Sequence, residues 1–310
     1  MIFQCTINQT MTIAGIGLHS GLPINMVLRP ADAGTGIVFH RTEGLRTVAI
    51  PAISANVIDT RLATVIGKGG LSVSTIEHLM AALTAFGIDN IHIDIDGPEV
   101  PILDGSALPY VSLLERAGLR SLARSRKYLA VRKPVTVIDG EKRVTMIPSR
   151  FFRLTADINF DHPCIARQHR SVKLSRELFC RDLAAARTFG FLAEVEMLKA
   201  NGLARGASLD NAIGIGEEGI VNPEGLRYSD EFVRHKILDA IGDFSLAGHH
   251  ILGHVKSFKG GHDINHQMVE KLIASPDCWK LVEFSDRDLD EALQAGIPNY
   301  ATADLLLTKI

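Results

Sequence analysis

The order of expected secondary-structure elements repeats in the two halves of this 310-residue chain. In each half, alternating strands and a small insert precede a helix that ends near a glycine, and a strand, a loop and a second helix follow. The helices of this repeated order are expected over residues 75–86, about 107–117, 230–248 and about 265–274, and further helices are expected over 175–183 and 191–200. The halves share this order without a clear residue repeat, so duplication is inferred from the order of elements alone.

The repeated order predicts an α+β fold of two similar two-layer α/β sandwich domains. We expect them to pack through their helices, with the sheets outside and a small insert in each. A polar, basic stretch over residues 119–127 marks the boundary, so the N-terminal domain is expected over residues 1–126, with a β insert at about 36–70. The C-terminal domain is expected over residues 127–310, with an insert at about 188–216.

Composition excludes several classes of protein. Apolar residues make up 46% and charged residues 22%, which is ordinary for a soluble globular protein with a sizeable core. A net charge of −2, without a long run of one sign, gives no indication of a nucleic-acid partner. The four cysteines form no C-x-x-C pair, which argues against a zinc ribbon and suits a reducing compartment. No signal peptide and no apolar run of about 20 residues is recognised, so we expect a cytoplasmic protein.

The helix expected over residues 230–248 carries three polar side chains in one line. His235, Asp239 and Asp243 are spaced four apart and share one side of the helix, while apolar residues form its buried side. Asp230 or the preceding serine can cap the start, and Gly248 can end the helix in a left-handed conformation. His235 and Asp239 could bind one metal ion, although a pair at this spacing is more often a solvated ion pair.

Glu77 and His78 stand at the start of the helix expected over residues 75–86. Glu77 can form a capping box with Ser74, or it can be a base beside a metal ligand. The H-E-x-x-H motif is absent, so further ligands must come from elsewhere in the chain, and His235 and Asp239 are the best candidates. Two imidazoles, one carboxylate and a position for water are typical of catalytic zinc, which lowers the pKa of water toward ~7. Glu77 could then accept the proton of that water.

His262 follows two glycines on a loop that comes directly after an expected strand. From this position it could enter a cleft and act as an acid, and Asp243 could hold its imidazole and favour the charged form. An exposed loop histidine fits the sequence equally well. His249, His250 and His254 share no helix face with Asp239, and we expect them to be structural.

Together, these motifs resemble the UDP-3-O-acyl-N-acetylglucosamine deacetylase family, which consists of zinc amidases at the committed step of lipid A biosynthesis. The resemblance is carried by residues 15–21, 74–79, 89–91, 101–107, 186–191, 230–243 and 260–262, in the order of the family. It implies zinc-dependent hydrolysis of the acetamide of UDP-3-O-(hydroxyacyl)-N-acetylglucosamine to the free amine and acetate. It also implies one catalytic Zn²⁺ ion.

The resemblance assigns roles to the residues singled out above. The implied zinc ligands are His78, His235 and Asp239. Glu77 is implied as the general base, and His262 as the general acid that protonates the departing amine, with Asp243 orienting it. Thr188 would bond the oxyanion beside the metal, and Lys236 would help to hold charge at the same site.

The resemblance also implies how the substrate is held. The second insert would form an apolar passage for the acyl group. The implied substrate contacts are Phe160, Phe189, Phe191, Leu192, Val195, Leu198, Ala212, Lys142 and Lys259. The apolar residues of the helix expected over residues 191–200 fit a core stripe equally well, and surface lysines are more often solvated. Gly214 stands where the family often has a larger apolar residue, which leaves acyl-length preference open, and Gly260 replaces a more usual small polar residue.

The expected partner is therefore a UDP-sugar with a hydroxyacyl chain. We expect at most peripheral association with a membrane, no nucleic acid, and a monomer. Two alternatives stay open: the same metal site could act on another acylated amide, or the chain could be a non-catalytic lipid- or nucleotide-binding module whose motifs are capping boxes and surface ion pairs. The segment after about residue 276 matches nothing in the resemblance.

Overall fold

The computed structural model describes residues 2–284 and contains two large sheets with the same strand arrangement. The first has the order β2-β3-β9-β4-β5, from strands Met11–Ile16, Pro23–Pro30, Ile91–Ile95, Ile37–Glu43 and Arg46–Pro51. The second follows the same path, β12-β13-β19-β14-β15, from strands Val135–Asp139, Lys142–Ile147, His250–Phe258, Phe152–Asn159 and Arg167–Lys173.

The direction of the strands repeats as well. Strand β9 is antiparallel to β3 and parallel to β4, and β19 is likewise antiparallel to β13 and parallel to β14. One helix precedes each of these central strands and another follows it. The prediction of two similar α/β sandwiches is therefore confirmed at the level of topology.

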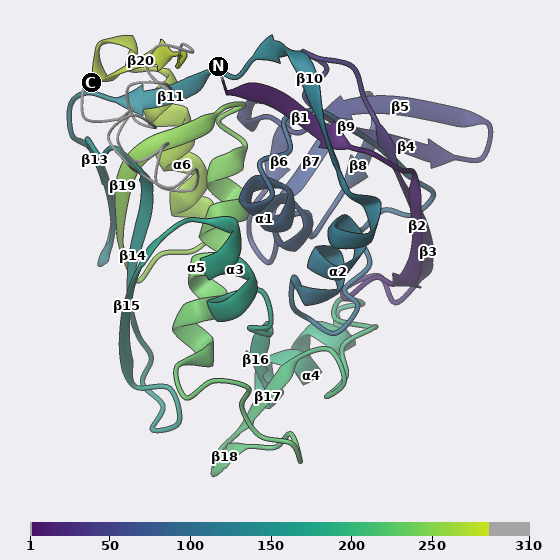
Figure 1. The fold of residues 1–310 in the computed structure, drawn as a ribbon. Coiled ribbons are helices and arrows are strands. Elements are labelled where there is room, and N and C mark those ends of the chain that lie inside the picture. Colours follow the sequence, from purple (N-terminus) through teal and green to yellow (C-terminus); the bar gives the residue numbers. More distant parts are fainter. Residues whose placement is uncertain (1, 285–310) are drawn as a thin grey trace.

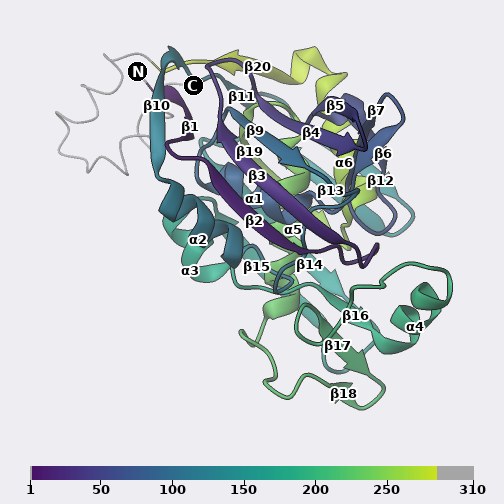
Figure 2. The same cartoon turned by 90° about the vertical axis from the view of Figure 1, so that its right-hand side faces the viewer.

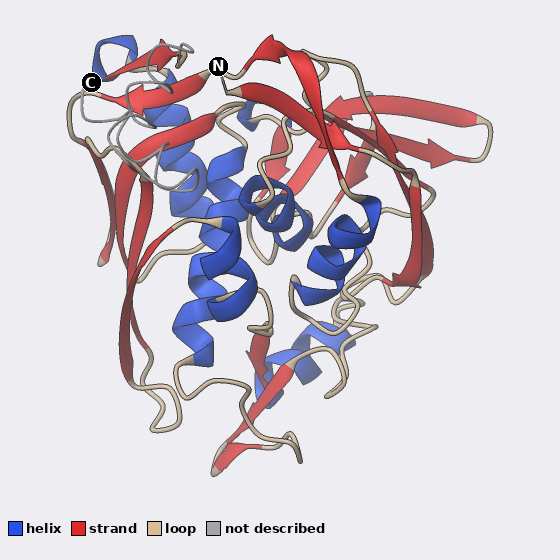
Figure 3. Ribbon diagram, viewed as in Figure 1, coloured by secondary structure: helices blue, strands red, loops and turns tan. Residues whose placement is uncertain are grey.

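The helices fill the space between the two sheets, as Figures 1 and 3 show. They are α1 (Glu77–Ala85), α2 (Leu108–Ala117), α3 (Arg176–Asp182), α5 (Glu231–Ser245) and α6 (His262–Ile273). Helices α1 and α5 meet at Gly242, where an added Cβ would overlap the carbonyl oxygen of Glu77. Glycine thus permits a backbone contact that places the start of α1 beside the C-terminal part of α5.

Helix α1 is buried almost all round. Every residue from 77 to 85 except Thr84 is buried, including Leu79, Met80 and Leu83, which have no exposed surface. Each such side chain contributes about 1.5–3 kcal/mol of burial free energy. Packing on all sides therefore holds α1 in place, and its first turn lies in the interior. None of the helices in residues 2–284 combines the length and apolar character that crossing a membrane requires.

The helix termini correct several expectations. The capping box is wrong, because α1 begins with Ile76 at its N-cap and no side chain bonds that end. Glu77 instead accepts a hydrogen bond from the backbone N–H of Thr64, at 3.1 Å. Asp230 precedes α5 without capping it. Gly248 has the expected left-handed conformation, with φ of 78°.

The inserts are also defined more closely by the strand pairing. Strands β4 and β5 belong to the first sheet, so the expected insert at 36–70 is too broad. A separate three-stranded sheet is formed by β6 (Val57–Asp59), β7 (Val65–Lys68) and β8 (Leu71–Val73). In the second insert, α4 (Leu192–Ala200) follows β16 (Phe189–Phe191) and precedes β17 (Ile213–Gly216) in the chain. Strands β16 and β17 pair in parallel, and β18 (Gly219–Ile220) completes their sheet. This unit projects beyond the end of α5 (Figure 2).

The remaining strands connect the halves. Strand β1 (Phe3–Ile7) pairs with β10 (Leu119–Ser125). The chain then enters the second sheet through β11 (Tyr128–Val131), which pairs with β19 and with β20 (Trp279–Val282). Two short 3₁₀ turns, Ser54–Asn56 and Pro276–Cys278, complete the described chain. The rest of the expected C-terminal domain, residues 285–310, lies outside the described residues.

Candidate metal centre and active site

The three expected metal ligands lie together where α1 meets α5. Oδ1 of Asp239 lies 3.2 Å from Nε2 of His235 and 3.5 Å from Nε2 of His78. The imidazole rings meet edge to face, with 4.9 Å between their centroids. One ligand atom from each residue lies within 4.8 Å of the others, and all three residues are buried. The arrangement is therefore a possible His-His-Asp metal site.

The donor set fits a cation such as zinc. Oδ1 of Asp239 is buried without a hydrogen-bond partner, which is costly for a carboxylate oxygen unless a positive group satisfies it. Nδ1 of His235 lies 3.0 Å from the carbonyl oxygen of Ala186, so it donates there and leaves the Nε2 lone pair directed at Asp239. Burial lowers the pKa of His235 to about 3, so this imidazole is neutral and available as a ligand.

Lys236 gives Asp239 its second partner. Its Nζ donates to Oδ2 of Asp239 at 3.0 Å. Burial opposes ionisation of Asp239, yet the positive charges around it, that of Lys236 among them, hold its pKa well below the usual range. Burial also works against the charge of Lys236, but Asp239 outweighs it and the pKa of the ammonium is raised. Asp239 is therefore an anion at neutral pH, with one oxygen committed to Lys236 and the other directed at the histidines.

His262 lies beside this site as the first residue of α6, so the expectation of a loop residue is wrong in detail. Its Nδ1 lies 3.0 Å from Oδ2 of Asp243. Burial by itself would lower the pKa of His262, but the carboxylate of Asp243, with Glu77 and Asp239 nearby, raises it to about 9. The imidazole is therefore protonated at neutral pH, and Nδ1–H donates to Asp243.

Glu77 faces His262 across the cavity. Its Oε1 lies 3.9 Å from Nε2 of His262, and its Oε2 accepts from Thr64. Burial raises the pKa of Glu77, and the neighbouring His262 and His78 oppose this rise. A carboxylate with a raised pKa is a better proton acceptor than an exposed one.

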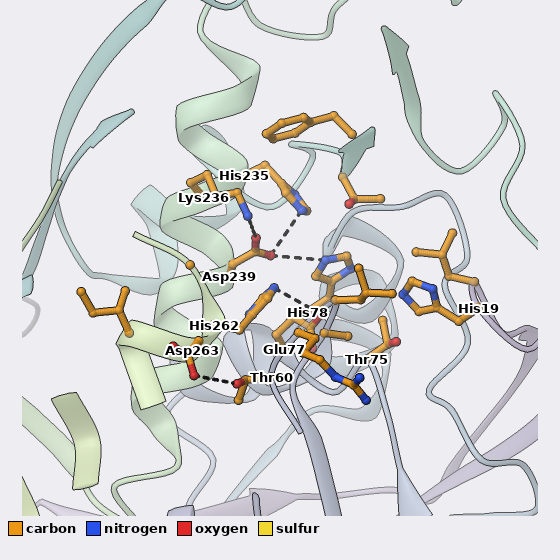
Figure 4. Close-up of a pocket in the computed structure, with 18 of the residues that line it drawn as sticks. His19, Thr60, Thr75, Glu77, His78, His235, Lys236, Asp239, His262 and Asp263 are labelled. Carbon is orange, nitrogen blue, oxygen red and sulfur yellow. Dashed lines mark hydrogen bonds and ion pairs between the residues drawn. The ribbon is translucent and has the colours of Figure 1, made fainter. Parts of the chain in front are cut away.

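These groups surround a cavity of about 290 Å³. Figure 4 shows the labelled side chains of Glu77, His78, Asp239 and His262 converging on it, from α1, α5 and α6. Three further expected residues line the cavity, namely Lys142, Thr188 and Phe189. The backbone of Thr188 is held on both sides, because its N–H donates to Gly105 and its carbonyl accepts from Ile213.

The other expected substrate residues lie further out. The ring of Phe160 packs edge to face on that of Phe189, with 5.7 Å between the ring centroids. Its centroid lies 6.3 Å from that of Phe191. On α4, the half-buried positions are Leu192, Val195 and Leu198, and Ala212 is half-buried on the following loop. Leu192, Val195, Leu198 and Ala212 form an apolar surface on the second insert and, unlike Phe189, do not line the metal cavity. Lys259 pairs with Glu141 at 2.6 Å and does not line the cavity.

The histidines expected to be structural lie away from the site. His250 is 3.4 Å from Asp89, and His254 is hydrogen-bonded to Thr155 at 2.8 Å. A second cavity, of about 500 Å³, includes His249 and His250 but none of the expected site residues. These histidines follow α5 closely in the sequence, but this does not bring their side chains into the site.

Sequence reasoning missed three residues of the site. Thr64 and Asn265 each donate a side-chain hydrogen bond to Asp243, at 2.6 and 2.9 Å. His19 lines the cavity from the glycine-rich turn. Asn265 could have been found, because it stands three residues after His262 on the same helix face. Thr64 carries no local signal, since its contacts come from the fold.

Comparisons with known proteins agree with this geometry. The model of the family described as UDP-3-O-acyl N-acetylglycosamine deacetylase matches residues 4–274. The chain is 69% identical over 283 residues to the UDP-3-O-acyl-N-acetylglucosamine deacetylase of Syntrophotalea carbinolica, covering 91% of this chain and 92% of that protein. It is 57% identical to the protein of the same name from Geobacter sp. strain M21, and the match covers 97% of this chain and 99% of that protein. The corresponding Myxococcus xanthus protein is 49% identical, covering 97% and 95%. This chain belongs to the UDP-3-O-acyl-N-acetylglucosamine deacetylase family.

Proposed function

We propose that this protein is a zinc-dependent amidohydrolase that removes acetate from UDP-3-O-(hydroxyacyl)-N-acetylglucosamine, the committed step of lipid A biosynthesis. The observation that carries the proposal is the unsatisfied Oδ1 of Asp239 between two imidazoles, with Glu77 and His262 on the same cavity. The names of the relatives support the substrate.

His78, His235 and Asp239 would hold one Zn²⁺ ion. When bound, zinc supplies Lewis acidity that polarises the amide carbonyl and makes a water molecule more acidic. This chain supplies two imidazole nitrogens and one carboxylate, so a bound zinc ion would keep a net positive charge. Lys236 orients the carboxylate by donating to its other oxygen.

Glu77 would act as the general base. It is buried on the cavity wall, and its two oxygens have different surroundings. Oε2 is held by the N–H of Thr64, whereas Oε1 faces His262. This arrangement leaves one oxygen directed at the cavity, where it can accept the proton of the attacking water.

His262 would protonate the departing amine. Its Nδ1–H is engaged by Asp243, so Nε2 is the atom that faces the cavity and carries the transferable proton. Protonation at neutral pH is supported by its pKa of about 9. The hydroxyl of Thr188 would stabilise the oxyanion, and the charge of Lys236 would assist.

The substrate would extend away from the cavity in two directions. The apolar surface of the second insert, with Leu192, Val195 and Leu198, suits the acyl chain, and Lys142 on the cavity wall suits the diphosphate. Gly214 packs against Leu192 with no room for a larger side chain unless its neighbours shift, so it contributes to the shape of this surface. Phe160, Phe189, Phe191 and Ala212, and Lys259 further out, remain proposed contacts on the same route.

We further propose a monomer that acts in the cytoplasm and associates at most peripherally with the membrane. Its four cysteines are free in the structure, which supports a reducing compartment. The half-buried apolar side chains of the second insert, which projects beyond α5, are the part suited to an acylated ligand.

Direct assay tests the function. The purified protein should release acetate from UDP-3-O-(hydroxyacyl)-N-acetylglucosamine, contain about one zinc per chain, lose activity on chelation and regain it with zinc. Activity only on a different acylated amide would retain the metal site and reject the substrate. Turnover that survives Glu77→Ala combined with His78→Ala would reject this site altogether.

A further inference from the structure

Thr64 occupies an unusual place between the two halves of the proposed machinery. It lies at the end of the loop between β6 and β7 and is 2% exposed. Its hydroxyl donates to Oδ1 of Asp243 on α5 at 2.6 Å and lies 3.4 Å from Nδ1 of His262. Its backbone N–H donates to Oε2 of Glu77 on α1 at 3.1 Å. One residue therefore contacts the base and both members of the acid pair.

The hydroxyl determines how the carboxylate of Asp243 is presented. Thr64 donates to Oδ1, and the amide of Asn265 donates to Oδ2 at 2.9 Å. His262 lies between these donors, with its Nδ1 at 3.1 and 3.0 Å from the two oxygens. A carboxylate with one fixed donor on each oxygen cannot rotate freely, so the plane of the imidazole partner is set.

The backbone of the same residue determines the position of Glu77. Glu77 has no capping contact, and the N–H of Thr64 is the hydrogen bond that holds its Oε2. The loop of the first half therefore ties Glu77 on α1 to Asp243 on α5.

We propose that Thr64 is a positioning residue that holds the base Glu77 and the acid pair His262–Asp243 in one fixed relative orientation. This inference rests on the proposed function, because it assigns Thr64 to the same reaction. The hydroxyl acts through Asp243 and His262 and touches neither the reacting amide nor the metal ligands.

The test compares Thr64→Val, which keeps the shape and loses the hydroxyl, with Thr64→Ser, which keeps the hydroxyl. We expect Thr64→Val to lower kcat by about 10- to 100-fold, with KM changed by less than about 3-fold and zinc content unchanged. Thr64→Ser should restore most of the loss. Thr145→Val is the matched control, because within residues 2–284 its hydroxyl bonds that of Thr136 on the sheet, at 3.0 Å, and contacts none of the proposed machinery.

A double-mutant cycle separates positioning from general damage. In a His262→Ala background the acid is already absent, so Thr64→Val should lower kcat by less than about 3-fold. Equal losses in both backgrounds, or a full kcat for Thr64→Val alone, would overturn the inference. If the valine variant does not fold, Thr64→Ser compared with Thr64→Ala isolates the hydroxyl in the same way.

An activity-independent readout keeps this inference distinct from the proposed function. The Nδ1 proton of His262 should be visible by NMR in the full-length wild-type and Thr64→Ser proteins, and should exchange faster with water in Thr64→Val. Unchanged exchange would reject the positioning role even if no deacetylation were detected. If the wild-type protein shows no deacetylation but the Nδ1 proton of His262 exchanges faster in Thr64→Val, only the proposed reaction is rejected.

Discussion

Nε2 of His78 in the first half of the chain lies 3.5 Å from Oδ1 of Asp239 in the second half. The candidate metal site is therefore formed only where α1 and α5 are packed together, and neither half contains all three of its residues. A bound ion would join the halves directly, so metal binding and stability should be coupled.

Metal removal should therefore destabilise the protein. A ligand at 100 times its Kd adds about 2.7 kcal/mol of stability to the state that binds it, so chelation should lower Tm and added zinc should restore it. Thermal unfolding with and without a chelator measures the shift. His235→Ala serves as the control, since it removes a ligand and should abolish the zinc-dependent part of the Tm. A zinc response that persists in this variant would place the ion elsewhere.

Loss of His262 should reduce turnover without removing the metal. His262→Ala is expected to lower kcat by ~10²–10⁴, the size typical of a lost general acid or base. Zinc content, measured by elemental analysis, should stay at the wild-type level because His262 is not one of the three clustered ligands. Loss of zinc together with activity would contradict the role given to this residue.

The pH dependence should follow His262 on the alkaline side. Burial lowers the pKa of His262, but Asp243, together with Glu77 and Asp239, raises it to about 9. Activity should therefore fall as pH rises through about 9, because the imidazole loses the proton that it donates. Asp243→Asn removes the main charge that raises this pKa, and the alkaline limb should move to lower pH. If the alkaline limb of the pH–activity profile does not move in Asp243→Asn, the fall in activity belongs to a group other than His262.

Stability should depend on the same ionisation. The folded pKa of His262 lies above its unfolded value of about 6.5, so the charged pair contributes fully below that pH and is lost as pH rises through about 9. Urea unfolding of the wild type and of His262→Ala at pH 6 and pH 10 measures this. The difference in stability between the two proteins should shrink at the higher pH; a constant difference would count against the pair.

Gly242→Ala tests the contact between α1 and α5. Helix propensity alone would favour alanine by up to about 1 kcal/mol. In this structure the added Cβ would overlap the carbonyl oxygen of Glu77, so we expect a net loss of about 1–3 kcal/mol. Chemical denaturation gives the sign directly, and a more stable variant would show that the helices can separate at no cost.

Much of this protein could be predicted from its sequence. The spacing of His235 and Asp239 follows from the geometry of one helix, and the two residues lie on one face as expected. The repeated order of elements led to the two matching sheets, and the motifs led to the family. These inferences succeeded because periodicity and short motifs depend on neighbouring residues.

Other features depended on distant parts of the chain. Glu77 fits a capping box by local rules, but the fold buries it and gives its carboxylate to the N–H of Thr64. His262 was expected on a flexible loop, yet it begins α6 and is held by Asp243. Local propensity could not predict these outcomes, because the competing partners come from other elements.

Local features of the chain were enough to predict the fold class, the helix that carries His235 and Asp239, and the family. The contact of His78 with Asp239, and the contacts of Thr64 with both Glu77 and Asp243, became apparent only in three dimensions. Helices and strands can be predicted locally because backbone geometry and side-chain periodicity specify them. The contacts across α1 and α5 arise from the packing of two halves, where Gly242 sets how closely they approach.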